Sequence, residues 1–257
     1  MLTLKNLTKI YHPGTVNEMT LFRNFNLTIH DGEFVTVVGS NGSGKTSLLN
    51  IICGSIPLEG GSIFLDEQEI TKMPDYKRMK RIGRVYQDPA MGTCGSLSIL
   101  ENFALADNKG NPFNLKFSIR KKRIAYYREL LRTLNLGLED KMDVKVGSLS
   151  GGQRQAMALL MSTMTDLDFL ILDEHTAALD PKTAEIIIEL TDHIVREKGL
   201  TTIMVTHNLR HAETYGNRLL MLDRGEIVMD KSGEAKANCT TESLLEMFNK
   251  ISVECGN

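Results

Sequence analysis

Eight consecutive residues indicate the kind of fold to expect: Gly39-Ser40-Asn41-Gly42-Ser43-Gly44-Lys45-Thr46. They match the pattern G-x-x-x-x-G-K-S/T, a glycine-rich loop that cradles phosphate groups. A short apolar run, Phe34–Val38, precedes the loop, and apolar residues at helical spacing follow it between Leu48 and Ile52. A strand, a phosphate loop and a helix in this order predict a nucleotide-binding α/β core.

The residue types of this loop suit a triphosphate. Glycines let successive backbone N–H groups point inward, and the helix N-terminus adds partial positive charge. Lys45 would reach the β and γ phosphates, and Thr46 would offer its hydroxyl to Mg²⁺. We therefore expect ATP and Mg²⁺ to bind at residues 39–46 and the adjoining Ser47. The alternative, a flexible glycine-rich turn, does not account for the flanking strand and helix.

Two adjacent acids, Asp173 and Glu174, follow a second short apolar run, 169–172. Open parallel sheets bind ligands at the carboxyl ends of their strands, and neighbouring carboxylates are unfavourable there without a cation. We expect Asp173 to complete Mg²⁺ coordination through water and Glu174 to polarise the water that attacks the γ phosphate. The alternative is a solvated turn after a core strand.

His207 lies two residues after a third strand-like run, 201–205. Parallel order would bring it to the same sheet edge as Asp173 and Lys45, which favours a role as a γ-phosphate sensor. The alternative is a cap at the start of a helix.

A second glycine motif lies about a hundred residues beyond the phosphate loop, at Leu149-Ser150-Gly151-Gly152-Gln153. It precedes a helical stretch that begins near Arg154, so it offers another helix N-terminus without side chains that would block an anion. We expect Ser150, Gly151, Gly152 and Gln153 to contact nucleotide as well.

The pattern along the chain predicts an α/β fold. Period-two alternation at Leu2 and Leu4, followed by Leu7 after a slip, and again at 25–29 indicates antiparallel strands at the N-terminus. Apolar runs separated by a helix, with Asp180 as its N-cap and Gly199 at its end, indicate a mostly parallel sheet with crossovers. Residues 88–165 have helical periodicity and are interpreted as an insertion in a P-loop NTPase core, and 219–229 as a hairpin.

With these motifs in this order, the sequence resembles the ATP-binding cassette (ABC) family from about Leu2 to Met229. Residues 39–46 look like its Walker A motif and 149–153 match its signature sequence. Residues 169–174 are similar to Walker B with the catalytic glutamate, and 177–180 resemble the D-loop. The resemblance implies one ABC ATPase domain over 1–257: a core at about 1–87 and 166–230, a helical subdomain at about 88–165 and a tail at 231–257.

The resemblance also implies roles for three further positions. Gln87 sits at the family's Q-loop, which implies catalytic and metal-binding roles, and His207 at its switch histidine. Tyr11 falls where an aromatic residue stacks on adenine. Two departures are visible: Ala177 stands where the D-loop commonly has serine, and 12–18 form a longer loop than many relatives have after the aromatic residue.

For the mechanism, the resemblance implies a head-to-tail pair of this chain with itself or a similar ATPase. The Ser150 helix of one subunit would cap the γ phosphate bound by Lys45 of the other, so hydrolysis would reopen the pair. The expected partners are integral membrane permease subunits and, through them, an extracellular substrate-binding protein. Residues 91–98 and a basic cluster lie where the family docks its permease, so we expect them to contact a cytoplasmic helix of the permease or lipid headgroups. The alternative for the cluster is a solvated helix face. The cluster comprises Lys109, Lys116, Arg120, Lys121, Lys122 and Arg123.

Composition sets limits on the partners. A net charge of −2 and a pI near 6.3 give no bulk electrostatic reason to bind nucleic acid. The four cysteines have no CxxC spacing, so neither a zinc site nor a disulfide framework is indicated. No run approaches the roughly 18 apolar residues that a helix needs to cross a bilayer. We expect a cytoplasmic protein held at the inner face of the cell membrane through its permease.

Competing nucleotide-binding classes fit less well. A small GTPase would need Asn-Lys-x-Asp, and 108–111 fail at the last position. A soluble ABC ATPase of DNA repair or translation stays as the alternative, although such proteins usually carry two cassettes or a long coiled coil. Residues 173–184 look like the ATPases of bacterial importers with lipoprotein binding subunits, some of which carry aromatic amino acids. The sequence itself does not name the solute.

Overall fold

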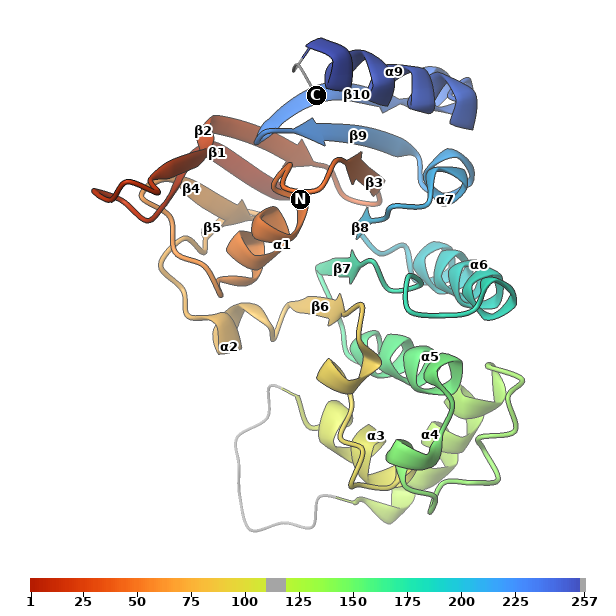
Figure 1. The fold of residues 1–257 in the computed structure, drawn as a ribbon. Helices are drawn as coiled ribbons and strands as arrows, with labels where there is room; N and C mark the ends of the chain where they lie inside the picture. Colours follow the sequence, from red (N-terminus) through yellow and green to blue (C-terminus); the bar gives the residue numbers. More distant parts are fainter. Residues whose placement is uncertain (110–118, 255–257) are drawn as a thin grey trace.

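The computed structural model describes residues 1–109 and 119–254 of the 257-residue chain, with side chains described up to residue 250. These residues form two β-sheets and the helices that pack around them (Figure 1). Lys116, one member of the predicted basic cluster, lies outside the described residues. Within the described ranges, every helix is too short or too polar to cross a bilayer.

The larger sheet has six strands in the order β10-β9-β3-β8-β7-β6. All neighbours are parallel except β10 and β9, which form the predicted hairpin, so the expected mostly parallel sheet is confirmed. The strands span Phe34–Gly39 (β3), Ile82–Val85 (β6), Phe169–Asp173 (β7), Thr202–Val205 (β8), Arg218–Asp223 (β9) and Glu226–Ser232 (β10).

Every residue of β3, β6, β7 and β8 is buried, which explains why these segments are mostly apolar instead of alternating. Arg84 of β6 and Asp173 of β7 are their buried charged residues. Each segment has only four to six residues, which is shorter than a typical buried helix. Because the four strands run in parallel, the residues that follow them emerge at one edge of the sheet.

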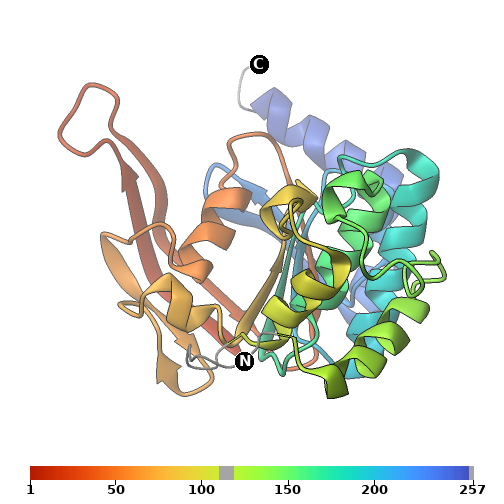
Figure 2. The same ribbon diagram turned by 90° about the horizontal axis from the view of Figure 1, so that it is seen from below.

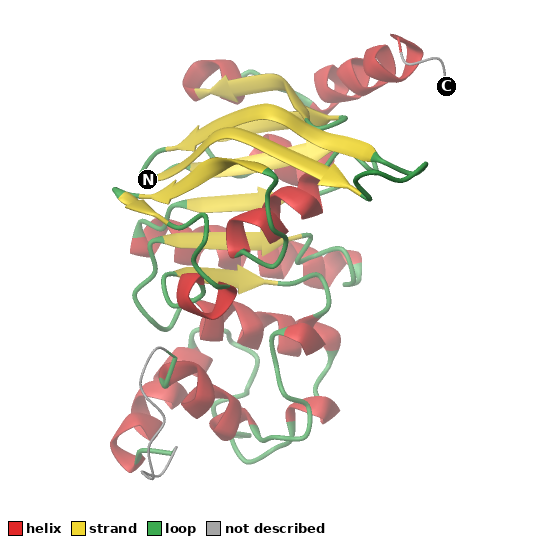
Figure 3. Ribbon diagram, turned by 90° about the vertical axis from the view of Figure 1, so that its left-hand side faces the viewer, coloured by secondary structure: helices red, strands yellow, loops and turns green. Residues whose placement is uncertain are grey.

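The smaller sheet is antiparallel and has the order β2-β1-β4-β5. It lies nearest the viewer in Figure 3. Leu2 and Leu4 face the core, and the pairing register shifts between Leu4 and Leu7, where Asn6 has a φ of 51°. This irregularity accounts for the break in the period-two pattern of the sequence. The strands span Leu2–Tyr11 (β1), Met19–Ile29 (β2), Gly60–Leu65 (β4) and Gln68–Glu69 (β5).

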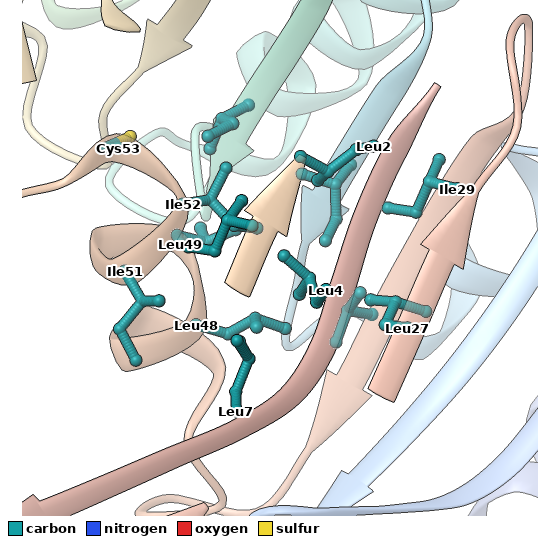
Figure 4. Packing of buried hydrophobic residues seen from close by; sticks show 14 of the residues in the cluster. Leu2, Leu4, Leu7, Leu27, Ile29, Leu48, Leu49, Ile51, Ile52 and Cys53 are labelled. Carbon is teal, nitrogen blue, oxygen red and sulfur yellow. The ribbon is translucent and has the colours of Figure 1, made fainter. Parts of the chain in front are cut away.

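Helix α1, Lys45–Cys53, packs against the smaller sheet. Leu48, Leu49 and Ile52 lie beside Leu4 of β1 and Leu27 of β2 (Figure 4). All five side chains are buried, and burying a leucine or isoleucine side chain contributes about 1.5 to 3 kcal/mol. This contact fixes the helix that follows the phosphate loop.

The helical insertion lies between β6 and β7, which are neighbours in the sheet. Its helices α3 and α5 begin with capping boxes at Ser98 and Ser150. They share a core with α6 on one side of the six-stranded sheet, whereas α1 and the smaller sheet lie on the other side (Figure 2). The insertion contains Pro89–Met91 (η1), Ile99–Asp107 (α3), Lys121–Arg132 (α4), Val146–Ser148 (η2) and Gly151–Ser162 (α5).

Helix α6 has the bounds that its capping residues predict: Asp180 accepts from Thr183 N at its start, and Gly199 is left-handed at its end. The C-terminal segment packs on the protein, since Leu244 is buried with Val38 and Met221. The remaining helices span Asp75–Arg78 (α2), Pro181–Lys198 (α6), Leu209–Thr214 (α7), Gly233–Ala237 (α8) and Thr241–Glu254 (α9).

Candidate nucleotide-binding and hydrolysis site

The phosphate loop joins β3 to α1. Gly44, with a φ of 106°, is the N-cap of α1, a conformation that side-chain-bearing residues rarely adopt. Lys45 Nζ donates to the carbonyl oxygens of Gly39 and Ser40, each at 2.8 Å, and burial lowers the pKa of this amine. The loop therefore wraps around its own cation, at the end of a helix whose free N–H groups attract anions.

The turn between β9 and β10 supports the loop, a role the sequence analysis did not foresee. Ser40 Oγ donates to Asp223 Oδ1 at 3.1 Å, and Gly225 N donates to Ser43 O at 2.9 Å. A methyl group at Gly39 would lie 2.3 Å from the Leu222 carbonyl oxygen, so this position needs glycine. The hairpin thereby fixes the path of the loop.

One cavity of about 220 Å³ brings together many of the residues proposed for ATP and its hydrolysis. Parallel strand order explains this, because the loop, Glu174 and His207 all follow carboxyl ends of neighbouring strands. Ser40 and Ser43 belong to the same loop without lining the cavity. The predicted residues along its wall are Tyr11, Asn41, Gly42, Gly44, Lys45, Thr46, Ser47, Glu174 and His207.

Tyr11 ends β1 directly beside the first turn of α1. Its hydroxyl donates to Ser47 Oγ at 3.0 Å, and Lys9 Nζ lies 5.2 Å from the centre of its ring. The longer loop at 12–18 follows Tyr11 without drawing its ring away from the cavity. The ring is thus fixed at the cavity wall, where it could stack on a base.

Glu174 and His207 come from the ends of β7 and β8. Glu174 has a φ of 48°, a left-handed conformation that costs free energy for a residue with a side chain. Its backbone N–H donates to Val205 O at 3.0 Å, and its carboxylate Oε1 lies 2.6 Å from His207 Nε2. The strained residue is held by the neighbouring strand, with its carboxylate against an imidazole.

A second cavity, of about 620 Å³, is lined by all three residues predicted to hold Mg²⁺: Thr46, Gln87 and Asp173. A hydroxyl, an amide oxygen and a carboxylate are the oxygen donors that Mg²⁺ prefers. The residue types therefore fit this ion.

Two buried residues next to this cavity, Arg84 and Gln155, are not predicted from the sequence. Arg84 Nη2 donates to Asp173 Oδ2 at 2.6 Å, and Gln155 of α5 donates to Tyr86 O at 3.0 Å, directly before Gln87. Arg84 is the cation that the adjacent acids require. Gln155 connects the helical insertion to the loop that carries Gln87.

The signature residues lie apart from both cavities. Ser150 and Gln153 cap each other's backbone N–H groups at the start of α5, with donor–acceptor distances of 3.2 and 3.1 Å. Ser150 is exposed, while Gly151 and Gln153 are half-buried and Gly152 is buried against α6. Within one chain this helix start does not meet Lys45, as expected if a second copy supplies the nucleotide.

The basic cluster is partly internal. Lys109 Nζ donates to Ile82 O, and burial lowers the pKa of this amine to about 8. Arg123 pairs with Asp107, which also accepts from the Tyr127 hydroxyl. Arg120, Lys121 and Lys122 are exposed, so the face available to a partner is smaller than the sequence suggests.

Comparison with known proteins agrees with the geometry. Residues 22–177 match the family described as ABC transporter. The chain is 50% identical over 248 residues to the tyrosine transport ATP-binding protein of Clostridioides difficile, covering 96% of this chain and 98% of that protein. It is 33% identical over 236 residues to the spermidine/putrescine import ATP-binding protein PotA of Haemophilus influenzae, covering 90% of this chain and 58% of that protein.

A solved structure supports both the fold and the pairing. It is an ATP-binding cassette in a dimeric, post-hydrolysis state bound to ADP and phosphate, 32% identical to this chain, with a TM-score of 0.75. The match covers 90% of this chain and 98% of that cassette. Relatives named for import favour the transporter hypothesis over a soluble ATPase of DNA repair or translation. The chain therefore belongs to the ABC transporter family, as an ATP-binding and ATP-hydrolysing subunit that energises import.

Proposed function

We propose that this chain powers the import of an aromatic amino acid, as one of two cassettes bound to a permease at the inner face of the cell membrane. The substrate class is supported by the tyrosine transport relative, whose identity of 50% extends over nearly the full length of both chains. The polyamine and methionine importers are 33% and 30% identical. An extracellular binding protein would deliver the solute to the permease.

The catalytic assignment rests on the 220 Å³ cavity. Residues of the phosphate loop line it together with the Tyr11 ring, the Glu174 carboxylate and the His207 imidazole. The backbone of residues 39–44 and Lys45 bind the phosphates, and Tyr11 stacks on the base. Glu174 accepts the proton of the attacking water. His207 holds this carboxylate and contacts the γ phosphate.

Thr46, Gln87 and Asp173 would hold Mg²⁺, because all three oxygen donors line one cavity. When bound, the ion would neutralise charge that develops on the phosphates. Ser150, Gly151, Gly152 and Gln153 of the second copy would close on the same nucleotide. In each copy these four residues belong to the helical subdomain at about 88–165, so this subdomain would move with them. The bond from Gln155 to Tyr86 O would couple the movement to Gln87, the next residue.

The experiment is uptake into vesicles that contain the chain and its permease subunits. With ATP inside and labelled tyrosine plus its binding protein outside, we expect uptake that stops with Lys45→Met. Tyrosine, phenylalanine and tryptophan should compete, whereas spermidine and methionine should not. Uptake of spermidine or methionine instead would contradict the substrate class and leave the ATPase role intact.

A further inference from the structure

A guanidinium lies against the carboxylate proposed to serve Mg²⁺. Arg84 on β6 and Asp173 at the end of β7 belong to adjacent parallel strands, and their side chains meet at 2.6 Å. Both are buried, with 6% and 12% of their side-chain surface exposed. Removing one partner from such a pair is costly because the other charge is left buried alone. The chain itself therefore balances the charge of Asp173 before any metal ion binds.

Three elements hold this guanidinium in place. Arg84 Nη1 donates to Asn50 Oδ1 of α1 at 2.8 Å and lies 3.7 Å from Cys53 Sγ. The guanidinium carbon lies 4.6 Å from the centre of the Tyr86 ring, within the range of a cation–π interaction. Arg84 is thus fixed between α1, β6 and β7 and cannot leave Asp173 without breaking these contacts.

The same guanidinium faces the proposed metal site. Arg84 lines the 620 Å³ cavity together with Thr46, Gln87 and Asp173. Its bond occupies Oδ2 of Asp173, which leaves Oδ1 for a metal-bound water. Arg84 Nε is buried and has no hydrogen-bond partner in the described parts of the chain. A cation of the protein and the proposed Mg²⁺ therefore share one carboxylate.

Building on the metal site proposed above, we propose that Arg84 is a positioning residue that sets how strongly nucleotide binding depends on Mg²⁺. The guanidinium orients Asp173 and opposes the approach of a second cation through like-charge repulsion. It also adds positive charge near phosphates that carry no metal ion. Both effects reduce the difference in affinity between Mg²⁺-bound and metal-free nucleotide.

The test compares the dissociation constants of fluorescent ADP and of a non-hydrolysable ATP analogue, measured in EDTA and in Mg²⁺. In Arg84→Met we expect the ratio of the EDTA value to the Mg²⁺ value to rise roughly tenfold, because a unit charge acting over a few ångströms in a partly buried site changes a binding constant by at least that factor. Arg84→Lys keeps the charge and should stay within about threefold of the wild-type ratio. Arg84→Gln, which is neutral but polar, gives the same test if the methionine variant does not fold.

Arg81→Met is the matched control. Arg81 pairs with Asp168 just before the same two strands, at the end remote from the nucleotide cavities. Its loss should leave the ratio unchanged. A double-mutant cycle adds a readout independent of binding: Arg84→Met should lower the melting temperature less in an Asp173→Asn background, because no buried charge is then left unpaired.

Two results overturn the proposal and are distinguishable. If wild-type affinity depends on Mg²⁺ but Arg84→Met keeps the wild-type ratio, or Arg81→Met changes it equally, Arg84 does not set the dependence. If the affinities of both the wild type and Arg84→Met are the same in EDTA and Mg²⁺, the metal site itself is wrong, and the role of Arg84 fails with it.

Discussion

Glu174 and His207 follow two neighbouring parallel strands, and His207 Nε2 lies 2.6 Å from Glu174 Oε1. The contact joins a carboxylate that is 13% exposed to an imidazole that is 45% exposed. Glu174 reaches it from a left-handed backbone that the adjacent strand holds by a hydrogen bond from its N–H group to Val205 O. The proposed base and the residue that orients it are therefore assembled by the sheet alone.

Glu174→Gln should stop hydrolysis without preventing nucleotide binding. The amide keeps the size of the side chain but does not accept the proton of the attacking water, so turnover should fall by about two to four orders of magnitude. Phosphate release measures turnover, and fluorescent ATP measures binding. ATP should then trap the closed pair, which size-exclusion chromatography detects as a dimer.

Glu197→Gln is the control for this variant, because Glu197 is 67% exposed on α6, near its C-terminal end. It should hydrolyse ATP at the wild-type rate. Turnover of Glu174→Gln near the wild-type rate would exclude Glu174 as the base. A dimer that forms equally well with ADP would exclude the γ phosphate as the group that closes the pair.

Tyr11→Ala should weaken ATP binding roughly tenfold or more, since stacking of a base on an aromatic ring contributes about 1 to 3 kcal/mol. Tyr11→Phe keeps the ring and loses only the bond to Ser47 Oγ, so its affinity should stay within about threefold of wild type. Tyr11→Phe is therefore the matched control for the ring. Equal affinities for Tyr11→Ala and wild type would place the base elsewhere.

The sequence predicts residues whose role follows from strand order. Asp173, Glu174 and His207 each follow an apolar run, and parallel strands bring their carboxyl ends to one edge, so their proximity could be inferred without coordinates. The loop at 39–46 carries its own pattern and needs no partner to be recognised. These parts of the site are local in sequence or depend on a general rule of topology.

Arg84 could not be predicted in the same way. It is a single arginine in the short run Ile82–Val85, and its meaning depends on the pairing of β6 with β7, which places it against a residue 89 positions away. Gly225 is similar, since its turn supports the phosphate loop only because β9 lies next to β3. Long-range pairings of this kind leave no periodic signal in the sequence.

Gly152→Ala should impair hydrolysis, and Thr183→Ser should restore it. A methyl group at Gly152 would lie 2.3 Å from Thr183 Cγ2, so α5 would have to move away from α6 and displace Ser150. Serine lacks that methyl group, and the nearest remaining side-chain atoms lie 3.6 and 3.8 Å away, which is ordinary contact. We expect hydrolysis to fall at least about tenfold in the single variant and to recover in the double variant.

Thr183→Ser alone is the control, and it should keep wild-type turnover because the N-cap Asp180 accepts from the backbone N–H of residue 183, which serine keeps. Binding of ATP to the isolated chain should not change in any of the three variants, since the signature helix lies apart from Lys45. Loss of binding in Gly152→Ala would show that the substitution damages the fold and does not act on the pair.

His175 should make the protein less stable below neutral pH. The ring is 2% exposed, and Nε2 lies 3.0 Å from Thr191 Oγ1, whose own proton goes to Ile187 O. The ring therefore donates through Nε2. Burial, with a smaller contribution from His211, lowers the pKa of His175 to about 3 from its ordinary value of 6.5.

The sign of the effect follows from proton binding. Between pH 6.5 and 3 the unfolded chain holds a proton on His175 that the folded chain lacks, so stability falls as the pH decreases, by about 1.4 kcal/mol per pH unit. His175→Leu removes this contribution. The loss of unfolding free energy between pH 7.5 and 5.5, measured by urea denaturation, should be smaller in the variant by about 1.4 kcal/mol. His193→Leu, at a site 74% exposed on α6, is the control and should keep the wild-type pH dependence. Identical pH dependence in His175→Leu and wild type would mean that His175 is protonated in the folded protein.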